Sequence, residues 1–167
     1  LMRALRYLLI AVFLLSLAGC GFQLRGKADL PPEMAQTQMI VDDANSTLAR
    51  RVRTLLEQNG VTFVSGAKAT AILEIPLNEV VTSVLTIADN ARVREYRISH
   101  TVRFRLTAAD GRELLTSQTL RQTREISFDE QKILASSREQ EYLKQDLAED
   151  LARLIVSRLE SVTADPG

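Results

Sequence analysis

The 167-residue chain contains one cysteine, one histidine and no tryptophan. A lone cysteine excludes an internal disulfide framework and a thiolate zinc site, and a lone histidine argues against a histidine-rich metal centre. The 21 basic and 21 acidic residues cancel, whereas a nucleic-acid-binding domain is usually strongly basic. The composition, with 46% hydrophobic and 25% charged residues, is that of a globular protein with one core.

The side chains and loops that enzymes use are scarce as well. A serine nucleophile needs a base, and the only histidine, His100, lies between Ile98 and Val102 in an alternating pattern, where we expect a side chain that is packed or at the rim of the core. Gly60 and Gly66 do not form a glycine-rich phosphate loop after a strand. We therefore expect no catalysis, no bound metal and no cofactor.

The N-terminus has the pattern of an export signal. Arg3 and Arg6 are the only charges before Cys20, and residues 7–18 are apolar except for Ser16. A membrane-spanning helix needs roughly 20 apolar residues, so this run is too short to span comfortably. A basic start, a short apolar stretch and small residues at its end are typical of a secretory signal peptide.

The signal ends in a lipid-attachment pattern. Residues 17–20 read Leu-Ala-Gly-Cys, which matches the bacterial lipobox, and only the Cys20 thiol can form a thioether to diacylglycerol. We expect residues 1–19 to be removed and Cys20 to become a lipidated N-terminus on the outer membrane. Several acyl chains on one residue anchor a protein stably, whereas a single chain binds membranes only marginally.

The remaining chain predicts a single α+β domain. We expect residues 20–36 to form a lead, residues 37–163 the domain and residues 164–167 a tail. In the domain, a short strand at residues 39–41 is followed by capping residues at 42–46 and a helix that ends at Gly60. Residues 69–87 are β-branched and extended, and Pro76 within them predicts a bulge or an edge. Residues 88–91 read as a turn.

Alternation with a period of two is clearest at residues 96–107, where every second side chain is apolar. Asp110 and Gly111 predict a hairpin turn, and residues 113–128 form the returning strand, whose register Leu114 and Leu115 leave open by one residue. Residues 129–135 read as a loop, Ser136 and Glu139 as a capping box, and about 24 further residues as an amphipathic helix. We therefore expect two helices on one face of a mixed or antiparallel sheet of about four strands, in the order β-α-β-β-β-α.

Charge is divided along this domain. Residues 92–124 contain eight arginines and only three acidic residues. Residues 129–150 contain seven acidic residues and only three basic ones. Arg97, Arg103 and Arg105 share one strand face, and the guanidinium fork binds phosphate bidentately. Two interpretations remain open. Either the arginines bind a polyanion, or they only keep an amphipathic hairpin soluble or pair with the acidic helix.

Several segments resemble one family. Residues 20–26 read Cys-Gly-Phe-Gln-Leu-Arg-Gly, and this run after a lipobox resembles the LPS-assembly lipoproteins of the LptE family. The helix from Leu48 to Asn59, the Glu95-Tyr96 opening of the alternating strand and Phe128-Asp129 after the hairpin resemble it too.

The resemblance implies a small α+β plug inside the outer-membrane β-barrel LptD, handling lipopolysaccharide for delivery to the outer leaflet. It also implies binding of lipopolysaccharide through basic residues, for which lipid A phosphates are suitable anions. Family members have basic residues before the Glu-Tyr pair and before the last helix. The nearest candidates here are Arg92, Arg94, Lys132 and Arg138.

Two other functions remain as alternatives. One is a different envelope lipoprotein, acting as a periplasmic scaffold or as a peptidoglycan-associated binding module. The other is a lipid-anchored hydrolase, which would need a nucleophile–base pair that this sequence does not offer.

Overall fold

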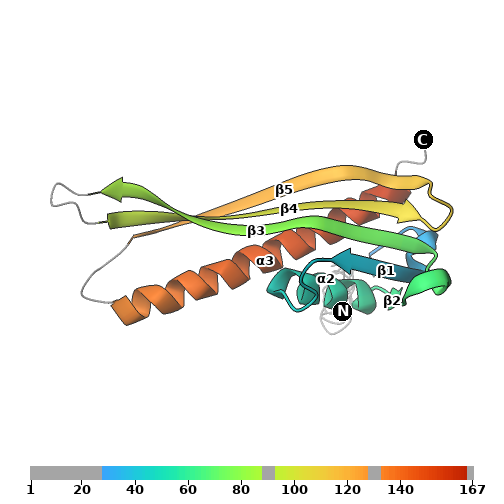
Figure 1. The fold of residues 1–167 in the computed structure, drawn as a ribbon, viewed down its shortest axis with the longest axis horizontal. Helices are drawn as coiled ribbons and strands as arrows, with labels where there is room; N and C mark the ends of the chain where they lie inside the picture. The colour runs from blue at the N-terminus through green and yellow to red at the C-terminus, as the bar shows by residue number, and fades with distance from the viewer. Residues whose placement is uncertain (1–27, 88–92, 128–132, 165–167) are drawn as a thin grey trace, which may run out of the picture.

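The computed structural model describes residues 28–87, 93–127 and 133–164. A five-stranded mixed sheet with the strand order β2-β1-β3-β4-β5 packs against two helices, α2 and α3 (Figure 1). This confirms the expected α+β class with both helices against the sheet. No helix within these residues is long and apolar enough to cross a membrane. The elements are η1 (Pro32–Ala35), β1 (Gln36–Val41), α2 (Thr47–Gln58), β2 (Thr62–Phe63), η2 (Gly66–Lys68), β3 (Ala71–Ile87), β4 (Val93–Ala108), β5 (Glu113–Ser127) and α3 (Ile133–Ala164).

The first half forms a compact β-α-β unit. Ser46 caps α2 because its hydroxyl accepts a hydrogen bond from the Ala49 amide at 3.2 Å. Gly60 ends the helix with a φ of 95°, a backbone conformation that glycine adopts without strain. The strand at Thr62–Phe63 was not predicted, because two residues are too short to show a period. It pairs parallel with β1, which begins three residues earlier than predicted, at Gln36.

Three long antiparallel strands form the rest of the sheet. The register between β3 and β4 shifts between Glu74 and Leu77, so the predicted irregularity at Pro76 is confirmed. The Asp110–Gly111 turn is confirmed as well, since the Gly111 amide donates to the Ala108 carbonyl at 2.9 Å. The register that the sequence left open places Leu115 opposite Leu106 and Leu120 opposite Val102.

The capping box predicted at Ser136 and Glu139 is wrong. Helix α3 already includes Ile133, so Ser136 lies inside the helix, where it is buried, and residues 133–135 are helical instead of a loop. Leucine and alanine favour a helix, so residues 134 and 135 extend it past the serine pair. The turn predicted at residues 88–91 and the remainder of the predicted loop, residues 129–132, fall in segments outside the described ranges.

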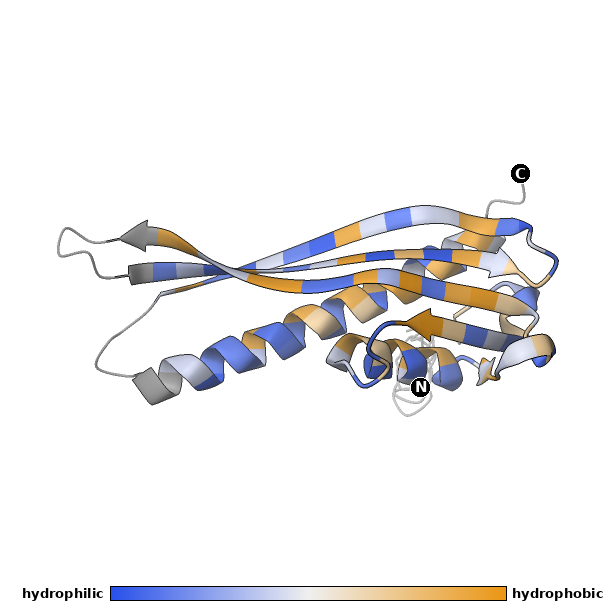
Figure 2. Ribbon diagram, viewed as in Figure 1, coloured by the Kyte–Doolittle hydropathy of each residue, from blue (hydrophilic) through white to orange (hydrophobic). Residues whose placement is uncertain are grey.

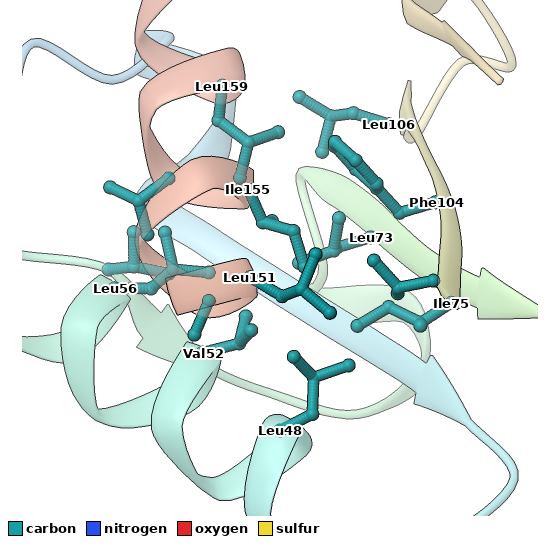
Figure 3. Packing of buried hydrophobic residues seen from close by; sticks show 14 of the residues in the cluster. Leu48, Val52, Leu56, Leu73, Ile75, Phe104, Leu106, Leu151, Ile155 and Leu159 are labelled. Atoms are coloured by element: carbon teal, nitrogen blue, oxygen red, sulfur yellow. The ribbon is translucent and has the colours of Figure 1, made fainter. Parts of the chain in front are cut away.

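The core lies between the sheet and the two helices (Figure 3). Leu151, Ile155 and Leu159 of α3 pack against Phe104 and Leu106 of β4, and all of these side chains are buried. Helix α2 supplies Leu48, Val52 and Leu56 from its predicted apolar stripe. Because each buried aliphatic or aromatic side chain contributes about 1.5–3 kcal/mol, this cluster fixes both helices on the inner face of the sheet.

Candidate ligand-binding surface

The face of the sheet that points away from the helices carries the predicted arginines. Along β4, Ile98, Val102 and Phe104 point toward the core and are buried. The alternate residues Arg97 and Arg105 therefore point to the opposite side, which we call the outer face. Figure 2 shows hydrophilic and hydrophobic segments alternating along β4. Arg103 shares this face, so all three arginines lie on one face of β4, as the alternation predicted.

Two of the three arginines on the outer face are neutralised by cross-strand carboxylates. Arg97 lies opposite Glu125 of β5, and its Nη2 donates to Oε1 at 2.7 Å. Arg105 lies opposite Glu74 of β3 and donates from Nε to Oε2. The hydrogen bond to Glu74 raises the pKa of Arg105 above its usual value. Neither positive charge is free for a ligand without competition from its carboxylate partner.

Arg103 differs from its two neighbours. Its side chain is exposed, and the residues opposite it are Leu77 and Thr119, neither of which carries a charge. Within residues 28–87, 93–127 and 133–164 no carboxylate forms an ion pair with it. Arg103 therefore presents an uncompensated guanidinium on the outer face.

A second uncompensated cation lies beside it. Arg121 of β5 pairs with Thr101, is exposed, and donates from Nη2 to the Ser99 hydroxyl at 3.1 Å. Because Thr101 shares the outer face with Arg103, Arg121 does too. The sequence did not single out Arg121 because the open register of β5 hid which face it occupies. Together, Arg103 and Arg121 form what we call the arginine pair.

Of the other predicted binding residues, Arg138 does not join this surface. Arg138 is exposed on α3, which packs on the opposite side of the sheet. Arg94 belongs to β4, near the end of the strand that is remote from the Asp110–Gly111 turn. Cys20, Arg92 and Lys132 are outside the described residues.

One arginine does pair with the acidic helix, as the second interpretation of the charge pattern anticipated. Arg124 of β5 points to the inner face and binds Asp146 at 2.9 Å and Asp150 at 2.5 Å. Hydrogen bonds from Arg153 and then from Arg124 lower the pKa of Asp150, and the bond to Asp150 raises the pKa of Arg124. These half-exposed ion pairs hold α3 against β5.

His100 is packed, which is one of the two positions that the sequence left open. The side chain is 2% exposed, and Nε2 lies 2.7 Å from Oδ1 of Asn78. Asn78 in turn donates to the Ser46 hydroxyl, which caps α2, so this chain of contacts is structural. The parts of the chain that the structure describes contain no group of three or more His, Cys, Asp or Glu that could hold a metal ion.

Most of the chain, including the strands of this surface, matches a known protein family. The model of the lipopolysaccharide-assembly family LptE matches residues 36–159, which is most of the chain. The chain belongs to the LptE family. The match spans the strands that carry the arginine pair, and it confirms the resemblance that the sequence motifs indicated.

Individual relatives agree with this assignment. The chain is 28% identical over 162 residues to the LPS-assembly lipoprotein LptE of Photorhabdus laumondii, covering 93% of this chain and 85% of the relative. Lipoprotein B from Nitrosomonas europaea is 26% identical, with a TM-score of 0.72 over 86% of this chain and 93% of that structure. Rare lipoprotein B from Shewanella oneidensis is also 26% identical, with a TM-score of 0.67 over 77% of this chain and 96% of that structure. The LptE-family fold is therefore shared with solved lipoproteins.

Proposed function

We propose that this chain is an outer-membrane lipoprotein that plugs the LptD β-barrel and helps to deliver lipopolysaccharide to the outer leaflet. Membership of the LptE family, which covers residues 36–159, is the observation that carries this proposal. The relative from Photorhabdus laumondii bears the name of an LPS-assembly lipoprotein. In this function the chain acts by binding and not by catalysis.

The arginine pair supports contact with lipopolysaccharide. Arg103 and Arg121 are exposed and lack carboxylate partners within the described ranges, so an incoming phosphate need not displace an existing ion pair. Guanidinium groups bind phosphate oxygens bidentately, and lipid A carries phosphates. Arg97, Arg105, Arg92, Arg94, Lys132 and Arg138 remain additional candidates, of which Arg97 and Arg105 are already compensated.

The lipid anchor is part of the same proposal. We propose cleavage after residue 19, thioether attachment at Cys20, and a lead of residues 20–36 that joins the anchor to the domain of residues 37–163. Replacement of Cys20 by serine is expected to leave an uncleaved or soluble protein. Membrane fractionation with mass spectrometry of the N-terminal peptide measures this, and a bare thiol at Cys20 in native material contradicts the proposal.

Partnership with the barrel is tested by extraction of the intact lipoprotein in mild detergent. We expect LptD to co-purify in a stable complex, and depletion of the chain to reduce lipopolysaccharide in the outer leaflet. A chain that is recovered alone after gentle extraction, with unchanged outer-leaflet lipopolysaccharide on depletion, would refute the partnership.

A further inference from the structure

One edge of the sheet is open along half of a strand. Strand β1 pairs with β3 only at Ala71–Ile75, whereas β4 accompanies β3 on its other side as far as Ile87. Beyond Pro76, no strand among residues 28–87, 93–127 and 133–164 lies on the β1 side of β3. Figure 1 shows β3 continuing past the tip of β1. We call residues 77–85 of β3 the open edge.

The open edge carries exposed apolar side chains on both of its faces. Val80, Val81, Val84 and Leu85 are 42%, 46%, 47% and 37% exposed. Val80 and Val84 lie opposite His100 and Tyr96, whereas Val81 lies opposite Ser99, so exposed valines occur on the inner and on the outer face. This stretch contains one charged residue, Glu79. A long apolar edge is a template for pairing with another strand.

The other edge of the sheet has the opposite character. Along β5, Arg121, Arg124 and Glu125 place three charges within five residues, and one glutamine and one threonine lie between the two arginines. Charged side chains on an edge strand prevent another strand from pairing with it. The molecule therefore protects one edge of its sheet against strand addition and leaves the other edge receptive.

We propose that the open edge of β3 binds an extended segment of a partner polypeptide. This segment adds a strand beside residues 77–85, where β1 no longer pairs with β3. The unpaired N–H and C=O groups of an edge strand are satisfied by another backbone, and a lipid chain cannot satisfy them. The contact between Asn78 and Ser46 holds the β1–α2 loop at the start of this position. The partner segment therefore begins where β1 ends.

Two acidic residues beside the open edge indicate which side chains the partner strand carries. Glu79 on the open edge and Asp42 in the adjoining loop are exposed, and neither forms an ion pair within the described parts of the chain. The partner strand therefore carries apolar residues toward Val80, Val81 and Val84 and a basic residue at the end nearest Asp42. A second copy of this chain fits less well, because its own open edge offers Glu79 and no basic residue.

This inference goes beyond the proposed function and does not depend on it, because the segment can come from the barrel or from another envelope protein. The test places a photoreactive p-benzoylphenylalanine at Val81 or at Leu85 of the full-length chain in the bacterium that produces it. Matched probes at Thr119 and Thr123 of β5 are exposed on the charged edge and serve as controls. Cross-linked peptides are sequenced by mass spectrometry.

We expect the β3 probes to cross-link to one segment of one protein, and the two β5 probes not to reach that segment. The probes at 81 and 85 are four residues apart, so an added strand is contacted at two positions about four residues apart. A partner helix would instead be contacted about nine residues apart, since it rises only 1.5 Å per residue. The inference is overturned by contacts about nine residues apart, by cross-links to lipid or to a second copy of this chain, or by the absence of any cross-link.

A charge variant provides a second measurement. Val81→Lys places an ammonium group on the open edge and is expected to lower cross-linking from the Leu85 probe about tenfold, because strand addition would desolvate it. Thr119→Lys adds the same charge to β5 and is expected to leave the yield unchanged. Equal yields in the two variants contradict strand addition. Strand contacts to LptD or to another envelope protein would both support this inference, whereas the barrel partnership is decided separately by co-purification in mild detergent.

Discussion

His100 of β4, which is buried, lies against the half-buried Asn78 of β3, with the imidazole Nε2 2.7 Å from the amide Oδ1. The Asn78 amide also donates to Ser46, so the pair joins two strands to the N-terminus of α2. The other imidazole nitrogen, Nδ1, is buried without a hydrogen-bond partner among the described residues. Burial lowers the pKa of His100 from its ordinary value of 6.5, because the site disfavours the charged ring.

The first prediction concerns stability and pH. Because the pKa of His100 is lowered in the folded state, the unfolded state binds more protons below pH 6.5, and the free energy of unfolding falls as pH decreases through that region. Urea unfolding at a series of pH values measures this loss. His100→Gln removes the only imidazole in the chain. An unchanged pH dependence in that variant would contradict the assignment.

The second prediction compares two leucines of α3. Leu151 is fully buried between α2 and the sheet, whereas Leu154 on the same helix is 37% exposed. Leu151→Ala is expected to lower the free energy of unfolding by about 2–5 kcal/mol, through lost burial and a residual cavity. Leu154→Ala is the matched control, with an expected loss of about 1 kcal/mol or less. Equal losses in denaturant titrations would show that α3 is packed differently.

The third prediction concerns the end of α2. Gly60 has a φ of 95°, and a Cβ built on it meets nothing within 4 Å, so only the backbone conformation opposes a side chain there. Gly60→Ala is expected to cost about 1–2 kcal/mol of stability. Gly60→Asn should cost less, since asparagine tolerates a left-handed conformation better than alanine. A thermal unfolding midpoint of Gly60→Ala equal to that of the parent would be incompatible with this backbone geometry.

The fourth prediction tests the arginine pair. The double variant Arg103→Gln, Arg121→Gln removes two uncompensated charges and is expected to weaken lipopolysaccharide binding by about tenfold at low salt. The difference from the parent should shrink as salt is raised, because exposed charges are screened. Equilibrium binding of labelled lipopolysaccharide to the purified protein measures both effects.

A charge-matched control accompanies that experiment. Glu74→Gln combined with Arg105→Gln removes one ion pair from the same face and leaves the net charge unchanged. We expect its binding to stay within about twofold of the parent, because an exposed ion pair contributes little beyond its own geometry. Equal losses in the two double variants would mean that the arginine pair has no special role.

The sequence predicted the elements with strong periodicity and missed those that depend on neighbouring strands. Alternation along residues 96–107 identified β4 and both of its faces, and Pro76 and Gly60 marked the bulge and the helix end. The strand at Thr62–Phe63 is formed by pairing with β1, which no local pattern reveals. The serine pair at 136 and 137 suggested a helix start, although the helix begins before it.

The candidate site was only partly visible in the sequence. The common face of Arg97, Arg103 and Arg105 follows from a period of two and is correct. Which of them is compensated depends on registers with β3 and β5, and adjacent leucines and bulges made those registers undetermined. For the same reason, the sequence could not place Arg121 beside Arg103 or Arg124 beside the acidic helix.

The irregularity at Pro76 divides the sheet into a half braced by β1 and a half made of β3, β4 and β5 alone. Between Leu77 and Val84 of the second half, side chains swap sides at every residue, so deleting two residues there and two from each of the paired strands would keep every remaining side chain on its original side. The reach of the molecule can therefore be lengthened or shortened in two-residue steps during evolution, while the hydrophobic centre around Leu151 is left untouched.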